Sequence, residues 1–251
     1  MKVFVLNLDC DRTRWNAVNA RLHALGVDFE RIPAVLGREL PDAEKHRSVS
    51  CFRWWCAVGR PIMDGEIGCA LSHSKAYRKI LADGLPMACV LEDDVVLDDR
   101  FPRVLNYLES KLLAEAKTVV LLSNHTNQKL GEKGDSEVSV VDGLLDMFAE
   151  GYVVTRTAAE NLLRENSPIV VPADHWPRWT KKGAIQLLHA VPTVCSQNWS
   201  GEFQSRTDAP SNLRRVDSLP LPFYVWHKFK RAVGKFIDAV LLKLESGSYR
   251  D

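Results

Sequence analysis

The sequence lacks the long apolar run that would anchor it in a membrane. None of its apolar stretches approaches the roughly 18 consecutive residues that a membrane-spanning helix requires, so we expect no transmembrane segment. The first apolar stretch, residues 3–8, is also too short for the core of a secretory signal, and polar residues follow it directly. We therefore interpret it as a β-strand.

An excess of charge of either sign is also missing, and cysteine is sparse. Lys and Arg number 33, and Asp and Glu number 32, so the formal net charge is +1. That balance argues against a general nucleic-acid-binding protein. The six cysteines are spread thinly over 251 residues and lie mostly beside apolar neighbours, unlike a disulfide framework. We therefore expect a cytoplasmic protein that binds no nucleic acid.

Glycine and proline are too few for a fibrous or disordered chain. With 14 Gly, 12 Pro, 46% apolar and 26% charged residues, the composition is typical of an ordinary globular protein. A chain of this length can bury a sizeable core. No linker is evident before residue 205, and no internal repeat or low-complexity segment is present.

Strand-like and helix-like segments alternate along the chain. Periodicity predicts strands at residues 3–8, 29–35, 88–91, 119–122 and 152–155, helices at 14–25, 66–82 and 157–164, and irregular structure at 38–64. Such alternation is typical of an α/β fold with a mainly parallel central sheet flanked by helices.

Three adjacent acids, Glu92, Asp93 and Asp94, follow the predicted strand at 88–91. Open α/β sheets bind their ligands at the carboxyl ends of such strands. A divalent cation would relieve the repulsion among the acids, and carboxylate oxygens suit Mg²⁺ or Mn²⁺, which can bridge a diphosphate. The alternative is a solvated acidic turn.

The predicted helix at 66–82 places Glu66, His73 and Tyr77 on one stripe. Gly65 directly precedes this helix and Gly68 lies within it, and the two glycines suggest close approach to another backbone or to a ligand. The alternative for His73 is an ordinary hydrogen bond in the core.

Two other segments combine residue types that suit sugar or phosphate. Arg12 and Arg14 lie between the first strand and the first helix, where guanidinium groups could bind phosphate, although this segment also suits a simple helix cap. Asp174 is followed by Trp176 and Trp179, whose rings could stack on an acceptor sugar while the acid serves as a base. The alternative is a turn with buried tryptophans.

Residues 225–244 predict a basic amphipathic helix. Apolar residues recur at helical spacing, and five Lys or Arg stand against a single Asp. Such a helix can lie on an anionic membrane surface, or it can pack against the protein's own core.

In combination, four motifs resemble glycosyltransferase family 25, the bacterial lipooligosaccharide galactosyltransferases and their relatives among collagen-modifying enzymes. The motifs are residues 5–8 with Arg12 and Arg14, residues 65–69 with Ser72 and His73, residues 90–95, and residues 151–156. The resemblance implies a GT-A-like single domain over residues 1–205, with 206–251 as a tail. It also implies a UDP-sugar donor, usually UDP-galactose, and inversion at the anomeric carbon.

The resemblance also implies roles for individual residues. Metal-binding roles fall to Asp94 and Glu92, with Mn²⁺ or Mg²⁺ as the ion and His175 or His189 as a further ligand. Donor binding falls to Asn7, Leu8, Arg12, Arg14, His73, Glu92 and Asp93, and acceptor binding to Trp176 and Trp179. Asp174 is the expected catalytic base, and Glu66 is the reserve.

The sequence therefore favours a metal-assisted inverting galactosyltransferase, or at least a hexosyltransferase. Its expected acceptor is a lipooligosaccharide or lipopolysaccharide, reached by peripheral contact with the anionic inner membrane. Two alternatives remain: a metal-dependent nucleotide hydrolase or phosphoryl-transfer enzyme, and a carbohydrate-binding protein without catalysis.

Overall fold

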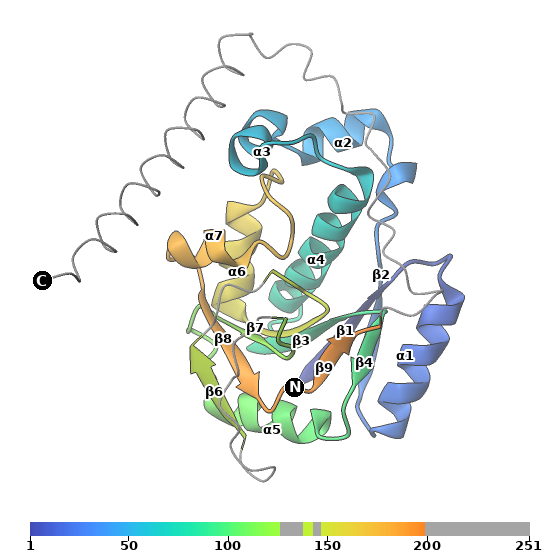
Figure 1. The fold of residues 1–251 in the computed structure, drawn as a ribbon, viewed down its shortest axis with the longest axis vertical. Helices are drawn as coiled ribbons and strands as arrows, with labels where there is room; N and C mark the ends of the chain where they lie inside the picture. Colours follow the sequence, from blue (N-terminus) through green and yellow to red (C-terminus); the bar gives the residue numbers. More distant parts are fainter. Residues whose placement is uncertain (126–137, 143–146, 199–251) are drawn as a thin grey trace, which may run out of the picture.

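The computed structural model of the protein describes residues 1–125, 138–142 and 147–198, and one seven-stranded sheet runs through them (Figure 1). The sheet has the order β2-β1-β3-β7-β5-β8-β6. Its strands are β1 (Lys2–Asn7), β2 (Phe29–Pro33), β3 (Met87–Glu92), β5 (Thr118–Leu121), β6 (Ser139–Asp142), β7 (Gly151–Thr155) and β8 (Gln186–Val191). A second, two-stranded sheet pairs β4 (Val95–Leu97) with β9 (Cys195–Gln197).

Most strands of the large sheet point the same way. The pairs β1–β2, β1–β3 and β5–β8 are parallel, and β7 runs antiparallel to both of its neighbours. Only β6 and β7 therefore oppose the other five of the seven strands. The predicted α/β fold with a mainly parallel sheet is confirmed.

Helices cover both faces of the sheet. They are α1 (Arg12–Ala24), α2 (Asp42–Ser48), α3 (Cys51–Val58), α4 (Asp64–Ala82), α5 (Phe101–Lys111), α6 (Arg156–Glu165) and α7 (Trp176–Lys181). Along β1, Val3 and Val5 pack with residues of α1 and α5, whereas Phe4 packs with residues of α4 and α6. Alternation along a strand thus buries both faces, which explains why the strands read as continuous apolar runs.

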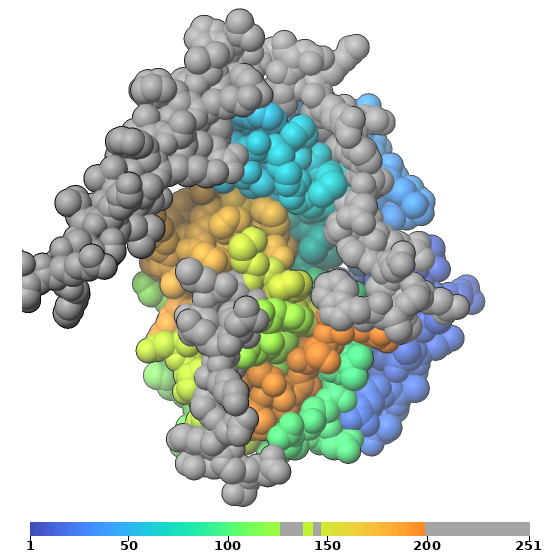
Figure 2. Space-filling view, viewed as in Figure 1, coloured from blue at the N-terminus to red at the C-terminus, as the bar shows by residue number. Residues whose placement is uncertain are grey.

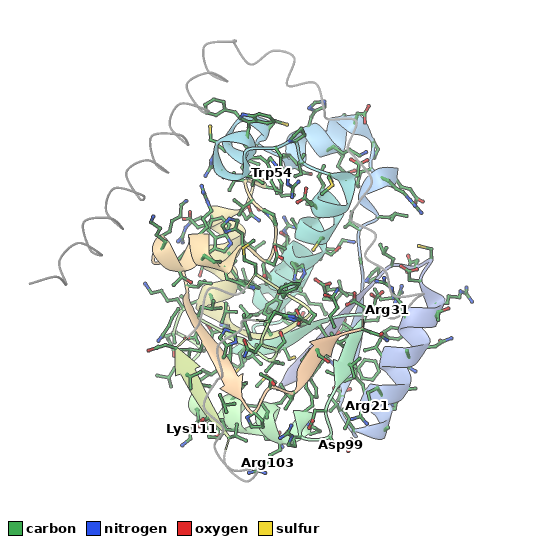
Figure 3. All side chains as sticks on the ribbon, in the orientation of Figure 1. Arg21, Arg31, Trp54, Asp99, Arg103 and Lys111 are labelled. Atoms are coloured by element: carbon green, nitrogen blue, oxygen red, sulfur yellow. The ribbon has the colours of Figure 1, made fainter. Side chains whose placement is uncertain are left out.

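The prediction of irregular structure at residues 38–64 is wrong. This segment forms a 3₁₀ turn, Gly37–Glu39, and the short helices α2 and α3. Trp54 of α3 is fully buried, its Nε1 donates to the Arg60 carbonyl oxygen at 2.9 Å, and it packs in a separate small core with Ile67 and Ile169 (Figure 3). Helices this short depend on tertiary packing rather than on their own periodicity, so the sequence pattern alone did not indicate them.

The segment before α4 is fixed by a buried ion pair. Lys45 Nζ of α2 lies 2.9 Å from Asp64 Oδ2 at the start of α4, and both side chains are buried.

In the space-filling view, α3 and the segment that leads into α7 form one continuous surface (Figure 2). A hydrogen bond from the Ser50 amide to the Ile169 carbonyl oxygen, at 3.0 Å, joins them.

Some predictions fall outside the described residues. The basic helix predicted at 225–244 and the boundary at residue 205 lie there, so they stay predictions. Among the residues that the structure describes, no helix is both long and apolar enough to span a bilayer.

Candidate functional site

The carboxyl ends of β1 and β3 bring together residues that are 85 positions or more apart in the chain. The two strands are parallel, and Leu6 pairs with Glu92. Asn7, the last residue of β1, therefore lies beside the acids that follow β3. Asn7 Nδ2 donates to Asp93 Oδ2 at 2.7 Å.

Asp93 is fixed by neighbours on both of its oxygens. Arg14 Nη1 donates to Asp93 Oδ1 at 3.2 Å, while Asn7 binds the other oxygen. Burial raises the pKa of Asp93, and the contacts with Asn7 and Arg14 act in the opposite direction. Asp93 thus orients Asn7 and Arg14 and has little free capacity for a cation.

Asp94, in contrast, has an oxygen to spare. Gln197 Nε2 donates to Asp94 Oδ2 at 3.0 Å, and Arg14 Nη1 lies 3.8 Å from that oxygen. Asp94 Oδ1 is buried and has no hydrogen-bond partner. Burial and the nearby Glu92 charge raise the pKa of Asp94 to about 7. A buried, unpartnered carboxylate oxygen next to other acids suits a divalent cation, so Asp94 fits the predicted metal-binding role.

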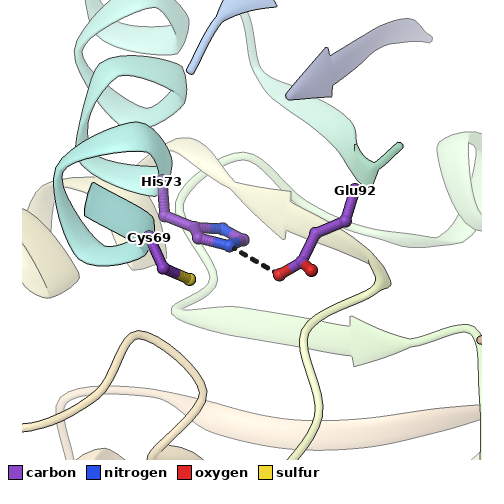
Figure 4. Close-up of side chains that lie close together, drawn as sticks. All are labelled: Cys69, His73 and Glu92. Atoms are coloured by element: carbon purple, nitrogen blue, oxygen red, sulfur yellow. Dashed lines mark hydrogen bonds and ion pairs between the residues drawn. The ribbon is translucent and has the colours of Figure 1, made fainter. Parts of the chain in front are cut away.

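Glu92 is linked to a chain of buried hydrogen bonds. Its Oε1 is hydrogen-bonded to His73 Nε2 at 3.2 Å (Figure 4). His73 Nδ1 is hydrogen-bonded to the Tyr152 hydroxyl at 2.7 Å. The Tyr152 hydroxyl is in turn 2.8 Å from that of Tyr77. His73 is therefore both a hydrogen-bonded core residue and a neighbour of the acids. Burial and the Glu92 charge raise the pKa of the adjacent Cys69 thiol.

A pocket of about 150 Å³ opens between these residues and the segment at 34–37. Its lining includes five of the predicted donor-binding residues, namely Leu8, Arg14, His73, Glu92 and Asp93, together with Asp94. We call it the first pocket. The other two predicted donor-binding residues, Asn7 and Arg12, do not line it and instead border a separate hollow with Asp9, Trp15 and Arg31. Asn7 is buried and reaches the first pocket only through its contact with Asp93, whereas Arg12 is exposed.

A second pocket, of about 370 Å³, adjoins the first and shares Cys69, Glu92 and Gln197 with it. Asp174 lines this second pocket. Burial, followed by the charges of Glu92, Glu66 and Glu150, raises the pKa of Asp174 to about 7. A carboxylate with a pKa near neutrality is suited to take a proton from a hydroxyl group.

Glu66 lines the same pocket, but its carboxylate is engaged. Both of its oxygens bind Arg60, at 2.5 Å and 2.9 Å, and Oε2 also accepts a hydrogen bond from the Met63 amide at the start of α4. Glu66 therefore caps the helix and is neutralised by an arginine. This position favours Asp174 over Glu66 as the base.

The structure gives no support to Trp176 and Trp179 as acceptor-binding residues. Both indoles are at most 1% exposed and belong to the main core under the sheet, and Trp176 Nε1 donates to the Phe148 carbonyl oxygen at 2.9 Å. A ring buried on both faces cannot stack on a sugar. His175 and His189 line neither pocket, so neither is placed to complete a metal site with Asp94.

Two site residues were missed in the sequence. Gln197 reaches Asp94 because β9 pairs with β4, and such a pairing of short strands leaves no local signal. Glu150 lines the second pocket, is 2% exposed and has an unpartnered Oε2. Its place directly before the buried strand at 151–155 was the available signal, because the start of an antiparallel strand lies at the same edge as the carboxyl ends of its parallel neighbours.

One wall of the first pocket depends on two glycines. A Cβ on Gly68 would lie 2.4 Å from the Val35 carbonyl oxygen and 2.8 Å from the Gly37 amide nitrogen, so the backbones of α4 and the segment at 35–37 touch. The predicted close approach of this helix to another backbone is confirmed.

We expect Gly68→Ala to destabilise the protein by about 2–3 kcal/mol, because the added methyl group meets backbone atoms that cannot move aside. Urea unfolding would measure this. Arg78→Ala, at an exposed position of the same helix, is the control and should unfold like the wild type. Equal unfolding midpoints for the two variants would contradict the close approach.

Comparison with known proteins adds an independent finding. Residues 1–176 match the family model for glycosyltransferase family 25, described as "LPS biosynthesis protein". A glycosyltransferase 25 family member of Aedes aegypti is 32% identical over 234 residues, and procollagen galactosyltransferase 1-B of Xenopus laevis is 31% identical over the same length. These alignments cover 90% of this chain and 36% of each relative.

Another relative bears a different description. A protein of Rattus norvegicus named probable inactive glycosyltransferase 25 family member 3 is 30% identical over 156 residues, which cover 60% of this chain and 26% of the relative. The chain thus spans about a third of the length of the Aedes and Xenopus relatives. Because the family model covers more than half of the chain, the resemblance in its motifs is confirmed, and the protein belongs to glycosyltransferase family 25.

Proposed function

We propose that the protein transfers a hexose, galactose by analogy with its named relatives, from a UDP-sugar to a hydroxyl group of an acceptor saccharide. The observation that carries this proposal is the pair of adjoining pockets at the carboxyl edge of the sheet. One is lined by Arg14, Asp93 and Asp94, the other by Asp174, and they share Glu92. A transferase needs such a junction, because donor and acceptor must meet in line.

The acceptor hydroxyl binds in the second pocket, where Asp174 takes its proton. The acceptor oxygen attacks the anomeric carbon as the bond from that carbon to the diphosphate breaks, which inverts the configuration. Arg14 lies at the donor side, held in place by Asp93. Asp94 and Glu92 would hold Mn²⁺ or Mg²⁺, which when bound neutralises charge on the departing diphosphate.

The acceptor we propose is the oligosaccharide of a lipooligosaccharide or lipopolysaccharide. The description of the matching family model supports this class, whereas the Xenopus relative is named for procollagen. An array of glycan acceptors with UDP-galactose as the donor would separate the two.

Linked binding of nucleotide and metal tests the proposal. We expect UDP to bind more tightly with Mn²⁺ than without it, as measured by calorimetry, because the Asp94 carboxylate and the diphosphate would share the ion. Mn²⁺-dependent release of UDP from UDP-galactose should then increase when acceptor is added. If Mn²⁺ does not change the affinity for UDP, the protein is a carbohydrate-binding protein without catalysis. If UDP-galactose is hydrolysed at the same rate with and without acceptor, the protein is a hydrolase.

Two neighbouring arginines offer a matched pair for the donor pocket. Arg14 lines the first pocket, and Arg12 does not. We expect Arg14→Gln to weaken UDP binding by about 10-fold or more, since hydrogen bonds to charged groups contribute roughly 1.5–3 kcal/mol. Arg12→Gln should leave the affinity within about twofold of the wild type. An unchanged affinity in Arg14→Gln would show that UDP binds elsewhere, and an equal loss in both variants would show that the first pocket is not the whole of the UDP site.

A further inference from the structure

Three side chains with different donor atoms face one another where the two pockets meet. Cys69 and His73 are four residues apart on α4 and share a face of that helix, and Glu92 extends toward them from the end of β3 (Figure 4). The Cys69 Sγ, one ring nitrogen of His73 and one carboxylate oxygen of Glu92 all lie within 4.8 Å of one another. Small side-chain rotations would bring the three atoms to a common centre.

The chemistry of this set differs from that of the acids beside it. Asp94 offers only oxygen, which suits Mn²⁺ and Mg²⁺. A thiolate and an imidazole instead favour a softer ion, and a set of sulfur, nitrogen and oxygen ligands is typical of Zn²⁺. The two neighbouring sites would thus select different ions, although both can use Glu92.

The histidine is held as a metal ligand usually is. Its Nδ1 is hydrogen-bonded to the Tyr152 hydroxyl at 2.7 Å, and its ring stacks on the Tyr152 ring with centroids 5.7 Å apart. The Tyr152 hydroxyl is in turn hydrogen-bonded to the Tyr77 hydroxyl. These contacts leave Nε2 as the nitrogen that faces Glu92. A metal-binding histidine commonly uses its other ring nitrogen for such an orienting hydrogen bond.

We propose that Cys69, His73 and Glu92 form a binding site for Zn²⁺, with the fourth coordination position open to the pockets. On binding, the S–H bond of Cys69 breaks, its proton passes to solvent, and the thiolate coordinates the ion. Because Cys69 and Glu92 line both pockets, the bound ion occupies the passage between them. Inhibition of sugar transfer by Zn²⁺ is the consequence, and only this consequence rests on the proposed function.

Cobalt(II) in place of zinc tests the site without any need for activity. We expect one equivalent of Co²⁺ to give the near-ultraviolet charge-transfer band of a cobalt–thiolate bond in the 251-residue protein. The band should be lost in Cys69→Ser, a nearly isosteric change. It should persist in Cys56→Ser, which removes an exposed cysteine of α3, and in Asp94→Asn, which removes none of the three proposed zinc ligands.

Zinc competition completes the test. Zn²⁺ should displace Co²⁺ from the wild type, and Cys69→Ser should weaken Zn²⁺ binding by more than about 100-fold, because even the loss of a supporting partner around a metal costs roughly 10–100-fold. A wild-type spectrum without a thiolate band overturns the proposal, as does a band that survives in Cys69→Ser or disappears in Asp94→Asn. These spectra decide the Zn²⁺ site even if the protein transfers no sugar.

Discussion

Asp94→Asn should lower the turnover of sugar transfer by about 10³-fold or more and leave the fold intact. The neutral amide keeps the size of the side chain and can still accept a hydrogen bond from Gln197, so the loss falls on cation binding. A cation that neutralises a leaving diphosphate contributes several kcal/mol to the lowering of the barrier, which corresponds to roughly this factor. Initial rates over a range of Mn²⁺ concentrations, with a thermal melt of the same sample, provide the measurement.

The control for that substitution is Asp99→Asn. Asp99 is an exposed acid five residues further along the chain, paired with Arg21 at the surface. It should transfer sugar at the wild-type rate. Unaltered turnover in Asp94→Asn would remove Asp94 from the metal-binding role, whatever the behaviour of the other acids.

Asp174→Asn has the second large expected effect, a fall in turnover of about 10²–10⁴-fold, because general-base catalysis typically contributes that much. The pH dependence of the wild type should show the same group. Since burial raises the pKa of Asp174 to about 7, the active carboxylate form is lost as the pH falls below neutrality, and the rate should fall with it. The variant's residual rate should lack this step. A residual rate that kept this step would assign it to another group, first of all to Asp94, whose pKa burial and the Glu92 charge also raise to about 7.

The same substitution should stabilise the protein above neutral pH. A carboxyl whose folded-state pKa is raised destabilises the fold once the unfolded chain ionises, from about pH 4 upward, and the penalty is complete above pH 7. Asp174→Asn removes that penalty, so its melting temperature should exceed the wild type's at pH 8 and match it near pH 4. Equal melting temperatures at both pH values would contradict the raised pKa.

Much of the fold could be predicted because each buried strand is recognisable from a short stretch of the sequence. Buried strands such as β1 and β3 are continuous apolar runs, and the acids after β3 mark the carboxyl edge directly. Where a residue's role depends on distant packing, prediction was weaker. The sequence predicted Trp176 and Trp179 as sugar-binding residues, yet both rings are buried in the hydrophobic core.

Some residues of the candidate site are brought there only by the pairing of strands that are distant in the sequence. Glu150 directly precedes a strand that the sequence indicates, but no local pattern shows that β7 inserts between β3 and β5 in the antiparallel direction. Arg12 and Arg14 were indistinguishable as phosphate ligands until the turn of α1 placed one inward and the other in solvent. Local chemistry thus indicated a region of the sheet edge, and topology decides which of its residues lie together.

The small sheet of β4 and β9 positions Gln197, near the end of the described residues, beside the Asp94 carboxylate. Val95 pairs with Gln197, and the Asn198 amide donates to the Asp94 carbonyl oxygen at 2.8 Å. If this ladder slipped by a single position, Ser196 would pair with Val95, and its side chain would turn to the face that the Gln197 side chain now occupies. The register of these two three-residue strands therefore determines whether the Gln197 amide or the shorter Ser196 hydroxyl faces the Asp94 carboxylate.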